Sequence, residues 1–250
     1  MDFSLPTLAF DCLLIFFVEA LYSSVGHGGA SGYLAVLSFF SVAPTKMATT
    51  ALMLNVLVAG LSLFSYYRAK HLSFKLAWPF IAASIPAAFI GGSIPVSEKL
   101  YFLLLAAVLM FAAYSLSFSI KSLHDDAQHN PVKLAVSMPA GAGIGVLSGI
   151  VGVGGGIFLS PLMLLMKWAA TKQTAAVSAL FIVVNSLAGL AGRGLRGGMD
   201  VSTSFPLLAA AFCGGIIGSY YGATKLSGIL LRRILAFVLL IAEFKLIVTL

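Results

Sequence analysis

The sequence predicts an all-α integral membrane protein made of two inverted repeats, each with five apolar segments. The chain of 250 residues is 60% hydrophobic and only 9% charged, with a mean hydropathy of +1.05. No soluble domain of this size needs so much apolar sequence, so the lipid bilayer is the expected solvent. In addition, short connections separate the apolar segments, and a glycine-rich run in the first half has a counterpart in the second.

The ten segments, in chain order, cover residues 8–25, 30–43, 47–67, 75–93, 99–120, 134–151, 156–168, 173–192, 203–223 and 229–249. About eight are expected to be full transmembrane helices, and the others short broken or re-entrant half-helices. A polar stretch at 121–133 separates a first membrane repeat, 1–120, from a second, 134–250. Because five is an odd number, the second repeat is expected to lie upside down relative to the first.

The glycine runs are the main sign of duplication. Their matched residues, all at one constant offset, are Gly26, Gly28 and Gly29 in the first half and Gly152, Gly154 and Gly155 in the second. Gly156 extends the second run. Glycine can release the backbone from a helix and let amide N–H groups face a cavity. Glycines in membrane helices also serve close packing, but two matched clusters, each before a short segment, favour a transport site.

The two segments that follow the glycine runs, 30–43 and 156–168, are short. Each has about 13 residues, or about 20 Å of helix, against an apolar core of about 30 Å. Segments 1–2 and 6–7 are therefore interpreted as hairpins with glycine tips near the membrane midplane. Helices beginning near Ala30 and Ile157 would point their N-termini, and thus positive dipole ends, at a small anion. Complete crossings are the alternative and preserve the same orientation.

The basic residues predict the orientation. With the N-terminus outside, ten Lys and Arg residues fall on the cytoplasmic side and five outside. The positive-inside rule favours this arrangement, so both termini are expected outside. The same distribution indicates topology rather than a nucleic-acid surface.

The second run, Gly149 to Pro161 (GIVGVGGGIFLSP), together with ATKQTAAVSALF from Ala170 and NSLAG from Asn185, resembles the sulfite exporter TauE/SafE family of membrane permeases. The resemblance extends over essentially the whole chain. It implies transport of sulfite, thiosulfate, sulfonates or related sulfur-containing anions across the bacterial cytoplasmic membrane. Backbone amides can bind such compact oxyanions without a metal or a cofactor. The first half departs from the pattern, with His27 and Ala30 in place of Val153 and Gly156, which leaves substrate choice open.

Two ionisable residues precede or lie in the first run. An intramembrane histidine is costly unless it faces water or a partner, so His27 is a candidate for substrate binding and proton coupling. Glu19, two turns earlier, is a candidate proton carrier or a partner for a buried cation. The alternatives are a hydrogen-bonded structural histidine and a carboxylate at a helix-packing interface.

Asn55 and Asn185 occupy matching places in the third and eighth segments. They could donate side-chain amides to an oxyanion, or cap broken backbone and tie helices together. Arg193 and Arg196 could gather anions, but a flexible surface connection is the favoured interpretation. The histidines and aspartates of the central linker, His124 to His129, fit no helical metal-ligand face, so a solvated linker is expected.

The sequence thus predicts a permease that moves a small sulfur oxyanion by alternating access, with the substrate and the lipid bilayer as its partners. A passive anion channel is one alternative, and an intramembrane enzyme using His27 and Glu19 as acid and base is another. The substrate, the transport direction, the coupling ion and the oligomeric state, a homo-oligomer included, stay open.

Overall fold

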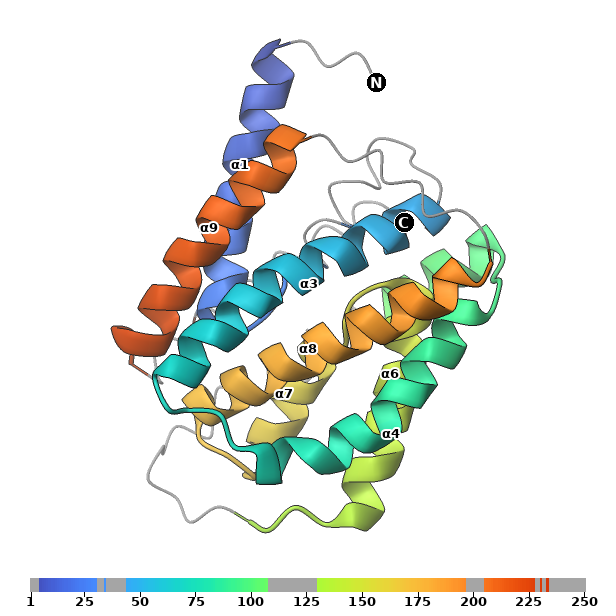
Figure 1. Cartoon of the computed structure of the whole chain (residues 1–250), viewed down its shortest axis with the longest axis vertical. Helices are drawn as coiled ribbons and strands as arrows, with labels where there is room; N and C mark the ends of the chain where they lie inside the picture. Colours follow the sequence, from blue (N-terminus) through green and yellow to red (C-terminus); the bar gives the residue numbers. More distant parts are fainter. Residues whose placement is uncertain are drawn as a thin grey trace.

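A computed structural model of the chain describes residues 5–30, 34, 44–107, 130–196, 205–227, 230 and 233. Most of the predicted segments 30–43 and 229–249, the end of segment 99–120 and most of the linker 121–133 lie outside these residues. The elements are α1 (Leu5–Ser24), α3 (Pro44–Arg68), α4 (Phe74–Ser93), α6 (Leu134–Val151), α7 (Gly156–Leu165), α8 (Thr171–Gly194) and α9 (Phe205–Thr224) (Figure 1). Residues 98–107 are also helical.

The described part of the chain is helical throughout, as predicted, with no strand among the described residues. Four of its helices, α3, α4, α6 and α8, are long and apolar enough to cross a membrane. Large apolar side chains on their outer faces, such as Phe64 and Trp78, are half exposed or more. These surfaces suit contact with lipid tails, because an aqueous surface rarely carries so many.

Two helix pairs are held together by glycines at every fourth position. In α9, Gly214, Gly218 and Gly222 pack on the backbone carbonyls of Phe16, Ala20 and Ser24 in α1; in α6, Gly141, Gly145 and Gly149 pack on those of Phe80, Ser84 and Ala88 in α4. Residues four apart share one helix face, and the missing side chains let the backbones approach closely. Residue numbers rise together in each pair, so both pairs run parallel.

The helices α3 and α8 lie side by side between these two pairs (Figure 1). Leu52 of α3 contacts Gly189 of α8, whereas Tyr66, a few turns later, packs with Ala175 and Ala176 near the start of α8. The two central helices are therefore antiparallel. Asn55, on α3, and Asn185, on α8, are both completely buried in this centre.

The second hairpin has unequal arms. Gly149 of α6 packs on Ala88 and Gly92, so α6 ends near the end of α4. The chain then turns back, and Gly154 lies beside Ser186 of α8. From there α7 extends for 10 residues, or about 15 Å, which is half of a membrane core. The predicted helix to residue 168 is three residues too long, because Lys167 has a positive φ of 54° and Trp168 N–H turns back to the carbonyl of Met163.

Candidate functional site

Both glycine runs are buried inside the helical bundle, over residues 22–30 and 152–161. Gly152 ends α6 with φ 90°, and Gly155 immediately precedes α7 with φ 84°. Side-chain-bearing residues rarely adopt this left-handed region, so both positions favour glycine. The matched glycines of the first run, Gly26 and Gly29, have φ 79° and 69°. The two runs thus share the left-handed conformation at two of the three matched positions; Gly154 also has a positive φ, but its counterpart Gly28 does not.

Each run packs against a central helix of the opposite half. Gly26 lies against the backbone of Ala175 in α8, and Gly152 lies against Ala48 in α3. A methyl group added at Gly152 would come within 2.7 Å of the Cα and carbonyl oxygen of Ala48. Backbone atoms cannot move aside as a flexible side chain can, so these contacts fix where both runs lie.

Asn55 joins the two runs. Its Nδ2 donates to the carbonyl oxygen of Gly152 at 3.4 Å, and its Oδ1 faces Gly28. A methyl group added at Gly154 would lie 2.7 Å from the same Nδ2. The structure therefore brings Gly28, Gly152 and Gly154 together around one side chain from the middle of α3.

Asn185 makes different contacts from its counterpart. Its Nδ2 donates to the carbonyl oxygen of Phe181 in its own helix at 2.9 Å, and its Oδ1 has no hydrogen-bond partner among the described residues. The Oδ1 of Asn55 likewise accepts no hydrogen bond there. Each asparagine thus commits an amide hydrogen to a backbone carbonyl and leaves an acceptor available.

His27 extends from the first run to the second. Its imidazole is buried, and a methyl group added at Gly156 would lie 3.5 Å from its Cδ2. Nδ1 lies 3.2 Å from the carbonyl oxygen of Val25, while Nε2 has no well-formed hydrogen bond with any described residue. Glu19 is completely buried in α1, and its carboxylate lies against Gly29. The histidine therefore faces the second run, and the carboxylate faces the end of the first.

Two serines near the runs were not predicted. Ser186 is completely buried, its Oγ would lie 3.3 Å from a methyl group at Gly154, and it has no hydrogen-bond partner in the described structure. Ser148, on α6, is also completely buried, and its Oγ has no hydrogen-bond partner in the described structure. The position of Ser186 directly after Asn185 was the available signal, but hydroxyls in membrane helices commonly bond to their own backbone and attract little attention.

The interpretation of Arg193 as part of a flexible surface connection was wrong. The residue lies in the last turn of α8 and is only 9% exposed. Its Nη2 donates to the carbonyl oxygens of Gly149 at 3.0 Å and Ile150 at 2.6 Å. The hydroxyl of Tyr101 donates to the next carbonyl, that of Val151, at 2.9 Å. The last carbonyls of α6, which lack helical partners, hold this guanidinium in place.

A family model for the sulfite exporter TauE/SafE family matches residues 12–246. The chain belongs to this family of membrane transporters. It is 33% identical over 246 residues to the probable membrane transporter protein y4hK of Sinorhizobium fredii, covering 97% of this chain and 100% of the relative. It is also 23% identical to the probable membrane transporter protein YdhB of Bacillus subtilis, over 84% of this chain and 88% of that protein. YunE of Bacillus subtilis, another probable membrane transporter protein, is 25% identical over 79% and 82%. No solved structure matches the chain significantly.

Proposed function

We propose that this TauE/SafE family protein is a permease for a small sulfur-containing oxyanion, such as sulfite, thiosulfate or an organosulfonate. The carrying observation is that two glycine runs, distant in sequence, lie buried together around Asn55. The family description names sulfite export, and compact oxyanions suit a site made chiefly of backbone amides.

The chemistry of α7 supports an anion. The first intrahelical donors, Phe158 and Leu159, both bond to the carbonyl of Gly155. The amides of Gly156 and Ile157 come before these donors, and an unpaired helix start carries about half an elementary positive charge. No side chain caps this end. A bound oxyanion would serve as the cap.

The directions of the helices support an inverted repeat of residues 1–120 and 134–250. The third and eighth segments, α3 and α8, are equivalent in the two halves, and they run antiparallel. The parallel pairs α1–α9 and α4–α6 are also equivalent, since each joins the first helix of one half to the fourth of the other. Two halves of the same orientation would instead place α3 parallel to α8.

The unequal contacts of the two asparagines support transport by alternating access. Asn55 bonds to Gly152 in the opposite half, whereas Asn185 bonds to its own helix. If the two halves exchange conformations, Asn185 would donate to the carbonyl of Gly26. Asn55 would then donate to the carbonyl of Ala51 in its own helix. Each end state would then use one asparagine as the bridge between the runs.

This exchange can be tested with a cysteine at Ser186 in a chain lacking Cys12 and Cys213. Asn55→Ala removes the bridge of the described state, and Asn185→Ala removes that of the other. The two variants should change labelling by a membrane-impermeant thiol reagent in opposite directions. Changes in the same direction would exclude the exchange.

The proposed location is the bacterial cytoplasmic membrane with both termini outside, as the positive-inside rule favours. At an inside-negative potential, anion efflux is downhill by about 2.3 kcal/mol per charge per 100 mV. An exporter therefore needs little coupling, whereas an importer needs a proton carrier such as His27 or Glu19.

The decisive experiment is thermal stabilisation of the purified protein by sulfite, thiosulfate, sulfonates, phosphate and amino acids. Selective stabilisation by sulfur oxyanions, with saturable flux in proteoliposomes, is expected. Stabilisation only by another class would overturn the substrate assignment. Flux without saturation would favour the passive channel, and chemical conversion of the anion would favour the intramembrane enzyme.

A further inference from the structure

The two hairpins are attached to the central helices at matching carbonyls. In the first half, the hydroxyl of Ser62 donates to the carbonyl oxygen of Ser23 at 3.2 Å, and the hydroxyl of Tyr66 donates to that of Ser24. These carbonyls lie three and two residues before Gly26. In the second half, Gly149 and Ile150 lie three and two residues before Gly152, and Arg193 alone binds both.

The two attachments differ in charge. Ser62 and Tyr66 bring neutral hydroxyls, whereas Arg193 brings a full positive charge that is nine-tenths buried. Within the described residues, Arg193 forms no ion pair with a carboxylate, and its Nε has no hydrogen-bond partner. A buried charge is costly unless something compensates it. The bonds to Gly149 and Ile150 compensate it only in part.

The position of this charge matters because two helix ends meet at the second glycine run. The carbonyl end of α6 carries about half a negative charge and the amide end of α7 about half a positive one, so alone they nearly cancel. Arg193 covers the negative end. The region around Gly152 to Gly156 is then left with a net positive charge.

We propose that Arg193 is a specificity-determining residue of the anion site: it supplies a fixed positive charge to the glycine runs by covering the carbonyl end of α6. This inference rests on the proposed anion transport. It explains an asymmetry between the runs, because the half with a neutral attachment has His27 in its run and the half with Arg193 has Val153. One half thus has an imidazole within its run, and the other has a permanent positive charge beside its run.

The test compares two probes, methanesulfonate with one negative charge and thiosulfate with two, bound to the purified full-length protein at pH 7.5. Arg193→Gln removes the charge and keeps an amide that can still donate to a carbonyl. It should weaken thiosulfate binding at least tenfold and methanesulfonate binding about threefold, because a lost charge affects a dianion more. Arg193→Lys keeps the charge and should keep the ratio of the two affinities.

Tyr101→Phe is the matched control, since it removes a hydrogen bond to the same end of α6 and no charge. The ratio of thiosulfate to methanesulfonate affinity in Tyr101→Phe should equal that of the wild type. Equal weakening of both probes in Arg193→Gln, or no weakening, would overturn the proposal and leave Arg193 as a purely structural clamp. If Arg193→Gln does not fold, the test rests on Arg193→Lys. A ratio of thiosulfate to methanesulfonate affinity in Arg193→Lys that differs from that of the wild type would then overturn the proposal. Absence of anion binding by the wild type would instead refute the proposed function itself.

Discussion

Replacing Gly154 with alanine should destabilise the protein by about 2–5 kcal/mol and abolish anion binding. Gly154 has φ 76°, and an L-residue in this left-handed region costs roughly 1–2 kcal/mol. The new methyl group would lie 2.7 Å from Nδ2 of Asn55 and 2.8 Å from Cγ2 of Ile182. Forcing such contacts into a packed interior costs typically about 1–3 kcal/mol more. The methyl group would also push Asn55 away from the runs.

Gly143→Ala is the matched control. Gly143 lies in the middle of α6 along its length, and a methyl group added there would meet nothing within 4 Å. Alanine should therefore stabilise this position by roughly 0.5–1 kcal/mol, because glycine loses more backbone freedom on folding. The same glycine-to-alanine change is therefore expected to lower the stability of the protein at Gly154 and to raise it at Gly143.

Both effects can be read from thermal unfolding in one detergent, with size-exclusion chromatography to confirm folded protein. At about 2–4 °C per kcal/mol, Gly154→Ala should lower Tm by about 4 °C or more, and Gly143→Ala should raise it slightly. A Tm for Gly154→Ala equal to that of the wild type would refute the crowded left-handed conformation. A lowered Tm with normal anion binding would refute the site while leaving the conformation intact.

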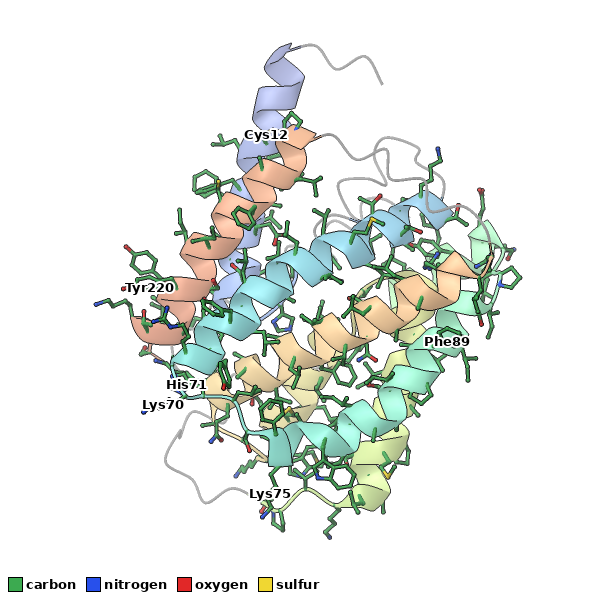
Figure 2. The ribbon with its side chains drawn as sticks, viewed as in Figure 1. Cys12, Lys70, His71, Lys75, Phe89 and Tyr220 are labelled. Atoms are coloured by element: carbon green, nitrogen blue, oxygen red, sulfur yellow. The ribbon has the colours of Figure 1, made fainter. Side chains whose placement is uncertain are left out.

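Three further substitutions have expected outcomes. Ser186→Ala should raise Tm, because it removes a buried hydroxyl that has no partner in the described structure. The same change should weaken anion binding, and unchanged binding would place Ser186 outside the site. His27→Gln should uncouple flux from an imposed pH gradient in proteoliposomes if His27 carries the proton; weaker binding at acidic pH with intact coupling would make it an electrostatic group instead. His71 lies in the α3–α4 connection, at the end of the bundle with Lys70 and Lys75 (Figure 2). Partial burial, helped by the nearby Lys172, lowers the pKa of its imidazole, so its contribution to stability is present above about pH 6.5 and lost as pH falls below it. His71→Gln should therefore reduce the loss of Tm between pH 7 and pH 5, and an identical loss in both proteins would contradict this.

The helices themselves could be predicted from the sequence because a membrane helix is encoded locally. Apolar runs of sufficient length gave the bounds of α4 within a residue and those of α6 without error. The short α7 and the glycines before it were also found, since length and residue type suffice there. The four long helices meet the same criterion in the structure.

Contacts between helices could not be predicted in the same way. Asn55 and Asn185 match in sequence, yet only Asn55 bonds to the opposite half. Arg193 looked like part of a loop because it follows the apolar segment, and only the end of α6 nearby explains its burial. The glycine ladders of α6 and α9 have a visible period, but their partners are chosen by topology. These contacts join residues that are far apart in the chain, and a single sequence does not indicate which distant residues meet.

The distribution of unsatisfied polar atoms is what separates this centre from ordinary packing. Buried polar groups in folded proteins nearly always have hydrogen-bond partners, because each missing bond costs about 1–3 kcal/mol. Some buried hydroxyls of the described core do have partners, as where Ser160 and Ser178 share a hydrogen bond of 2.7 Å, whereas Oγ of Ser148, Oγ1 of Thr174 and Nε of Arg193 have none. Around the glycine runs partners are missing for several atoms of the described structure: Nε2 of His27, Oδ1 of Asn55 and Asn185, and Oγ of Ser186. These atoms include both donors and acceptors, so a ligand that pairs with them all must also offer both. A hydrogen-bearing anion, such as hydrogen sulfite or an aminosulfonate, meets that requirement better than a fully deprotonated dianion does.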